Sequence, residues 1–359
     1  MLSPAHVLAA LEAKRAALHA YDLQAGAALD HYRQALAQFV RLGSEAIRAL
    51  VSGISSPGAL PTRERVAGRD AVLSFGAPWE NHQQARAWAL ETLQGVVTLA
   101  VDGSQITPNP EFSLPLGAVQ VGWFANPHRP EGDYVKQILF EVLPPDELHQ
   151  GEELSTRGFP DLQVNLRRFE RECQQLACLA REFAPSQGAR SAPPRAVGFL
   201  DGSLIVSFAG QMRPALRQRY VEAITALLDV SAATRVPIVG YVDTSYAGDL
   251  VALLDHLHGG ASGARLSDAS VRLSDAGLLR REMAWGDRSE ALQCARSDLV
   301  FEDNPESSYY GRVHFVYLKT TAENAPARLD LPAWLLEEGL LDWVVDVVRA
   351  ECIVGTGYP

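Results

Sequence analysis

The stretches VTLAVDGSQ (97–105) and AVGFLDGSL (196–204) share one pattern, and together they decide the fold class. Each is an apolar run of strand length that reaches Asp-Gly-Ser, so each predicts a buried strand ending in a turn at Asp102 or Asp201. Open α/β sheets place their ligands at the carboxyl ends of such strands. The alternative is that both Asp-Gly pairs are ordinary hairpin turns, because glycine adopts positive φ at little cost.

The segments around these stretches alternate between strand and helix patterns. Two strands are expected at 116–127 and 134–145, directly after the first stretch, and the three would form an antiparallel meander. Apolar residues at helical spacing predict a helix over 162–183. Further strands at 236–245 and 314–321 are separated by helices. The sequence therefore predicts an α/β fold, a mixed sheet flanked by helices.

The first part of the chain has a different character. Residues 4–53 are rich in alanine and leucine at helical spacing, which predicts two or more helices forming a hairpin or an arm. The stretch SGISSPGALPTRE (52–64) is rich in Gly, Pro and Ser and predicts a loop. We therefore expect an N-terminal helical region or arm over 1–60 and a second domain over 61–359.

Composition limits the function classes that are open to the chain. The 359 residues carry a formal net charge of -11, which argues against nucleic-acid binding over most of the surface. A groove can still be locally basic, and cations bound to carboxylates would neutralise part of the charge. No apolar run approaches the roughly 20 residues of a membrane span, and no secretory signal is recognisable, so a cytoplasmic location is expected. The four cysteines lack metal-site spacing and are expected to be thiols.

Three carboxylates could form a metal site. Asp102 and Asp201, on adjacent strands, could share a divalent cation, because Mg²⁺ and Mn²⁺ prefer carboxylate oxygens. On the predicted helix 162–183, Glu170 and Glu172 lie at opposite margins of the apolar stripe. Either glutamate could turn toward the metal, and both could equally be solvated charges. Asp243, at the end of the strand 236–245, is a further candidate ligand or an ordinary polar residue.

The order of these motifs resembles the NurA nuclease family. The likeness covers roughly residues 80–359, and each of its motifs is short. The residues that carry it are VDGSQ, the pair Arg168-x-x-x-Glu172, FLDGSL, LSDAGLLRREMAWGDRSEAL, ARLDLPAWL and the terminal GYP.

This resemblance implies an RNase H-like fold and a Mn²⁺-dependent deoxyribonuclease, with Mg²⁺ as the alternative ion. It implies 5′-to-3′ resection of DNA ends, by exonuclease and endonuclease cleavage, in double-strand break repair. It also implies a homodimer that acts with a HerA-type hexameric ATPase, a DNA translocase. Carried onto this sequence, the metal ligands and catalytic residues are Asp102, Glu172 and Asp201, with Glu170 as the alternate to Glu172. Tyr358 is the implied active-site tyrosine of the GYP motif, and two cations would clamp the scissile phosphate.

The sequence departs from the family pattern at two places. Asp243 stands where many members have lysine, and the chain ends at Pro359, where the family continues with a helix that carries a metal-site histidine. A rival hypothesis follows, a non-catalytic dimeric adaptor that regulates a translocase through its N-terminal helices. A third hypothesis is an RNA-directed nuclease of the same fold class.

Overall fold

The computed structural model describes residues 2–77, 79–109, 111, 113–129, 134–148, 160–185, 194–259, 266, 271–297, 309–355, 357 and 359. The strands are β1 (Gly58–Pro61), β2 (Val72–Leu73), β3 (Val97–Ile106), β4 (Gly117–Asn126), β5 (Val135–Leu143), β6 (Ala196–Asp201), β7 (Ile238–Val242), β8 (Arg288–Ser289), β9 (Leu292–Ala295), β10 (Val313–Leu318) and β11 (Ala327–Pro332). The main helices are α1 (Pro4–Phe39), α2 (Ser44–Leu50), α3 (His82–Leu93), α5 (Pro160–Glu182), α6 (Pro214–Thr234), α7 (Asp249–Gly259) and α10 (Leu341–Val354). The shorter ones are α4 (Pro145–Leu148), α8 (Asp275–Leu279), α9 (Trp334–Glu337), η1 (Ser207–Gln211) and η4 (Tyr309–Arg312).

The described strands join in one mixed sheet. Their order is β1-β9-β10-β11-β7-β6-β3-β4-β5, and β2 and β8 pair beside β10. β3, β4 and β5 form the predicted antiparallel meander. β6 lies parallel to β3, and β7 lies parallel to β6. The predicted α/β fold, a mixed sheet flanked by helices and preceded by a helical region, is therefore confirmed.

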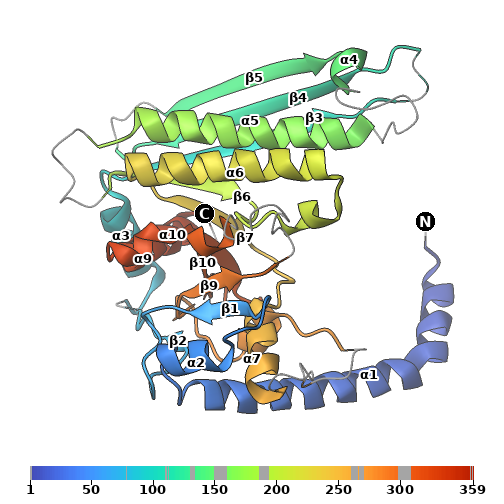
Figure 1. Ribbon diagram of the computed structural model, residues 1–359, viewed down its shortest axis with the longest axis vertical. Helices are drawn as coiled ribbons and strands as arrows, with labels where there is room; N and C mark the ends of the chain where they lie inside the picture. Colours follow the sequence, from blue (N-terminus) through green and yellow to red (C-terminus); the bar gives the residue numbers. More distant parts are fainter. Residues whose placement is uncertain are drawn as a thin grey trace.

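Helices cover the two faces of the sheet at different places. α5 and α6 lie side by side across β3 and β6, as Figure 1 shows in green and yellow. Side chains such as Val101 of β3 and Leu176 of α5 are fully or nearly fully buried between these layers. On the other face, α3 and α10 pack over β6, β7 and the strands beyond them, with Val197 and Val344 in a second core. On this second side, which faces away from α5, the strands β3, β4 and β5 are left uncovered, and Ser104, Gln120 and Lys136 are exposed there.

The N-terminal region consists of two helices, as expected, and its first part projects from the body (Figure 1). Along α1 the burial begins near its middle, and Tyr32 and Phe39 are each 1% exposed. Tyr32 donates a 2.8 Å hydrogen bond to Asp255 of α7, so the second half of α1 is fixed to the body. No helix among the described residues is both long enough and apolar enough to cross a membrane.

Two expectations about local structure were wrong. The loop expected over 52–64 contains β1, which pairs with β9, a partner too remote in sequence for a local pattern to show. The first Asp-Gly-Ser is not a turn, because β3 continues to Ile106 through its pairing with β4. What ends at Val101 is the parallel pairing with β6. The second Asp-Gly-Ser does end its strand, and Gly202 has φ +134°, a conformation that favours glycine.

Candidate active site

Asp102 and Asp201 lie where the parallel pairing of two neighbouring strands, β3 and β6, ends. Val101 of β3 and Leu200 of β6 are the last paired residues, and one aspartate follows each of them. Because side chains alternate along a strand, both carboxylates point away from the core beneath α5. Both are exposed, and both line a cavity of about 520 Å³ on the open side of the sheet. The structure thus brings these two predicted ligands together.

Glu172 approaches the same place from the α5 side of β3. Its side chain is 8% exposed. Arg168 donates hydrogen bonds to the Oε1 atom of Glu172 at 3.0 Å and to the carbonyl of Gly103 at 3.2 Å. A Cβ atom built on Gly103 would lie 2.3 Å from that Oε1 atom. Glu172 therefore occupies space that only glycine at position 103 leaves free.

Electrostatics connects the three carboxylates. Burial raises the pKa of Glu172 to about 7, Arg168 opposes the rise, and the charges of Asp102 and Asp201 add to it. A carboxylate in this environment is stabilised by added positive charge. The donor set, three carboxylates with no sulfur or imidazole, is the chemistry that Mg²⁺ and Mn²⁺ prefer.

The three carboxylates are the ligand type that such an ion prefers, but their side chains are not arranged around one common point. Within the described ranges, no group of three His, Cys, Asp or Glu side chains is arranged so that it could hold a metal ion. Asp102 and Gly103 are consecutive in β3, so Glu172, above Gly103, and Asp102 lie on different sides of the strand. Joint binding requires Glu172 to move around Gly103 toward the aspartates.

The other candidates lie in different places. Glu170 accepts two hydrogen bonds of 2.8 Å from Arg219 of α6, which holds it at the interface between α5 and α6. Asp243 is exposed just past the end of β7, at the same edge of the sheet as Asp201. Tyr358 lies outside the described residues, whereas the neighbouring Pro359 lines the cavity with the two aspartates.

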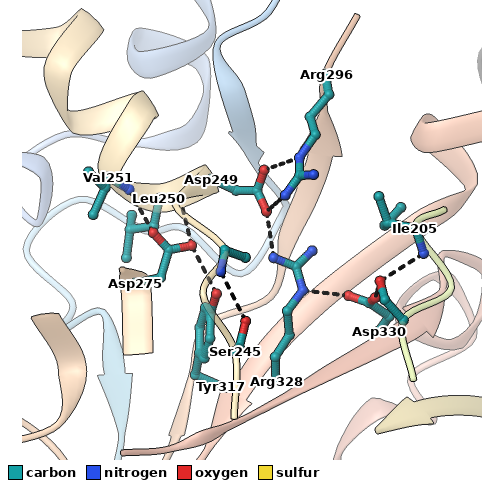
Figure 2. A network of polar contacts seen from close by, with 12 residues as sticks. Ile205, Ser245, Asp249, Leu250, Val251, Asp275, Arg296, Tyr317, Arg328 and Asp330 are labelled. Carbon is teal, nitrogen blue, oxygen red and sulfur yellow. Dashed lines mark hydrogen bonds and ion pairs between the residues drawn. The ribbon is translucent and has the colours of Figure 1, made fainter. Parts of the chain in front are cut away.

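A buried ionic network holds the turn after Asp201 (Figure 2). Asp330 of β11 is fully buried and accepts a 3.1 Å hydrogen bond from the backbone N–H of Leu204 and another from the Ser203 hydroxyl. The Ser203 oxygen in turn accepts a 2.9 Å bond from the N–H of Ile205. The loop that follows the second Asp-Gly-Ser is therefore anchored on β11 by one carboxylate.

The network continues from Asp330 into the base of α7. Arg328 donates to Asp330 at 2.7 Å and also to Asp249, which pairs with Arg296 at 2.7 Å. The side chains of Arg328 and Asp330 are at most 3% exposed. Buried charges are tolerated when they are paired in this way. The stretch ARLDLPAWL contains the available signal, two charged residues on one side of an apolar strand, but its sequence alone does not identify their partners.

Comparison with known proteins gives a family match and several structural likenesses. The model of the NurA domain family matches residues 96–359. The crystal structure of the NurA nuclease from Sulfolobus solfataricus is 11% identical, with a TM-score of 0.43 over 74% of this chain and 75% of that chain. A structure of NurA with manganese is 9% identical, with a TM-score of 0.41 over 71% of this chain and 82% of that chain. A structure of NurA bound to dAMP and manganese is 10% identical, with a TM-score of 0.38 over 70% of this chain and 80% of that chain. A search of curated proteins found no match.

Proposed function

The chain belongs to the NurA family, and from this membership we propose that it is a metal-dependent nuclease acting on DNA. One observation supports the proposal above all others: two exposed aspartates end the parallel pairing of β3 and β6 side by side in an open cavity. Mn²⁺ is the proposed ion and Mg²⁺ the alternative, because both prefer carboxylate oxygens.

In this proposal each carboxylate has a stated task. Asp102 and Asp201 supply oxygens from the point where the parallel pairing of β3 and β6 ends, and Glu172 supplies a third from α5. Divalent cations, when bound there, would polarise the scissile phosphate and activate water. Arg168, bonded to Glu172, orients that side chain and partly neutralises its negative charge until a cation takes over this role.

The test is digestion of end-labelled single-stranded and double-stranded DNA with Mn²⁺, and with EDTA as the metal-free control. We expect cleavage that requires the ion and falls by at least a hundredfold in Asp102→Asn and in Asp201→Asn. Asp229→Asn is the matched control, because Asp229 is a 66% exposed aspartate of α6 that forms an ion pair with the partly exposed Arg312. Unchanged cleavage in Asp201→Asn would overturn the catalytic proposal. Absence of cleavage by the unaltered chain would favour the adaptor hypothesis, and preferential cleavage of labelled RNA would favour an RNA-directed nuclease.

We further propose 5′-to-3′ end resection in double-strand break repair, a cytoplasmic homodimer, and a HerA-type hexameric ATPase as partner. Family membership supports these proposals, and the projecting part of α1 offers a surface for such an assembly. Leu8, Leu11 and Leu18 of α1 are 67%, 52% and 53% exposed. Substitution of these leucines by glutamate should reduce binding to the ATPase or self-association, measured by analytical ultracentrifugation. Assembly that survives the triple substitution would assign it to another surface.

A further inference from the structure

The open face of the sheet beside the two aspartates carries aromatic side chains in a regular grid. Strand register places Asp102 opposite Gly122 of β4, and Gly122 opposite Ile138 of β5. Two residues away along the strands, Ala100 lies opposite Phe124 and, on its other side, opposite Phe199 of β6. Phe124 in turn lies opposite Lys136 of β5. All of these residues line the cavity that contains Asp102 and Asp201.

The grid therefore has two rows. The acidic row contains Asp102, Gly122 and Ile138, and the aromatic row contains Phe199, Ala100, Phe124 and Lys136. Two residues of a strand span about 7 Å, which separates the rows by roughly the distance from a phosphate to its own base. The ring of Phe124 is partly exposed and stacks against Tyr134, with centroids 5.7 Å apart and planes at 23°. Tyr134 is 56% exposed and Ile138 is 60% exposed. Ala100, between the two phenylalanines, and Gly122, opposite Asp102, have a small or absent side chain and leave the floor of the cavity low.

We propose that this face is a stacking platform for unpaired bases, with Phe124 as the residue that takes the base next to the cleaved phosphate. This inference rests on the proposed nuclease function and adds to it the kind of strand that the site accepts. Aromatic side chains on an open sheet bind single strands by stacking, because every base has a π face, whereas the bases of a duplex stack on each other. The ammonium group of Lys136, beside Phe124, would contact a neighbouring phosphate.

The occupant is assigned to nucleic acid because of what adjoins the apolar side chains. An interface with a protein would be expected to bury charged groups little at its centre. Here the aromatic residues share one cavity with two carboxylates, a lysine and the amides of Gln120 and Gln137. A strand with stacked bases and a charged backbone uses both kinds of group, particularly once cations neutralise the aspartates.

The experiment measures binding without cleavage, in a chain carrying both Asp102→Asn and Asp201→Asn. The probe is a 12-nucleotide single strand with one 2-aminopurine, whose fluorescence is quenched by stacking, compared with the matched duplex. Phe124→Ala should weaken single-strand binding about tenfold, which corresponds to ~1.4 kcal/mol and lies in the range for one base on one ring. Phe124→Ala should also remove the quenching of 2-aminopurine. Lys136→Gln should instead reduce the slope of log binding constant against log salt concentration by about 0.7.

Phe208→Ala is the matched control, because Phe208 of η1 is a 53% exposed phenylalanine that packs against Tyr220 outside this cavity. Equal affinity of the Phe124→Ala and unaltered chains for the single strand would overturn the platform, and so would tighter binding of the duplex. A stable dimer in which Phe124 and Ile138 are protected from solvent would overturn the platform as well, because the open face would then be an interface between two copies of the chain. Failure of the nuclease proposal is a separate result, because it appears as absent cleavage while binding is still measured.

Discussion

Gly103 controls how closely Glu172 can approach β3, and this makes it a sensitive position. In Gly103→Ala the new Cβ atom would lie 2.3 Å from Glu172 Oε1 and 2.7 Å from Arg168 Cγ. We expect Glu172 to be displaced, metal-dependent cleavage to fall at least tenfold, and the free energy of unfolding to fall by about 1–3 kcal/mol from overpacking. Chemical denaturation and a cleavage assay measure the two effects.

A double substitution separates the clash from other effects at Gly103. When Glu172 is replaced by alanine, the nearest atom that a new Cβ would meet is gone, and Arg168 Cγ remains. The loss of unfolding free energy caused by Gly103→Ala should then be smaller than in the unaltered chain. An equal loss in both backgrounds would show that Arg168 or the backbone of β3, and not Glu172, limits this position.

The two glutamates of α5 should behave differently when each is replaced by glutamine. Glu172→Gln is expected to weaken Mn²⁺ binding at least tenfold, measured by calorimetry, because it removes a carboxylate beside Asp102 and Asp201. Glu170→Gln removes a partner of Arg219 and should leave Mn²⁺ affinity unchanged, with a stability loss of about 1 kcal/mol at most for this partly exposed pair. The reverse order of the two affinities would assign the metal site to Glu170.

At the scale of elements, the loop after β6 depends on β11. Ser203→Ala removes the hydroxyl that bonds to Asp330 and that accepts the N–H of Ile205. We expect unfolding free energy to fall by about 1–3 kcal/mol, because a donor and an acceptor lose their partner. Mn²⁺ affinity should fall with it, because Asp201 begins the same loop. A lower stability with unchanged Mn²⁺ affinity would limit the role of the network to folding.

The elements that the sequence predicts well are those with a strong local pattern. The apolar runs of β3, β6 and β7 and the apolar stripe of α5 are visible without any knowledge of their neighbours. β1 and the second half of β3 are different, because their pairing partners, β9 and β4, determine them. Asp102 and Asp201 could be expected to lie together because the apolar runs before them are recognisable, although β3 itself continues past Asp102. The support from Asp330 was not, because a buried ion pair is defined by contacts between remote residues.

At the scale of the whole molecule, buried Asp275 links stability to pH. Burial raises its pKa to about 6, and the neighbouring charge of Asp249 adds to the rise, so the folded chain holds this proton more strongly than the unfolded chain. Its contribution to stability is therefore complete at low pH and is lost as the pH rises from about 4 through 6.

Asp275→Asn removes this titration while keeping the size of the side chain. The stability of the unaltered chain relative to Asp275→Asn should decrease as the pH rises through that window, by up to about 3 kcal/mol. Urea denaturation at a series of pH values measures the difference. The matched control is Asp229→Asn, at an exposed position. A constant difference for Asp275→Asn would show that the carboxyl is charged throughout.

The pairing of β1 with β9 also sets a condition on how the chain is made. Gly58 pairs with Ala295, so β1 leaves the ribosome about 240 residues before its partner exists. At roughly 5–20 residues per second, this delay is on the order of 10 to 50 seconds. During that time the strands β3 to β7 can assemble among themselves, whereas α1 and α2 must wait with their apolar sides uncovered. The N-terminal region, although it is synthesised first, therefore completes its packing only after the strands of the active site have been made.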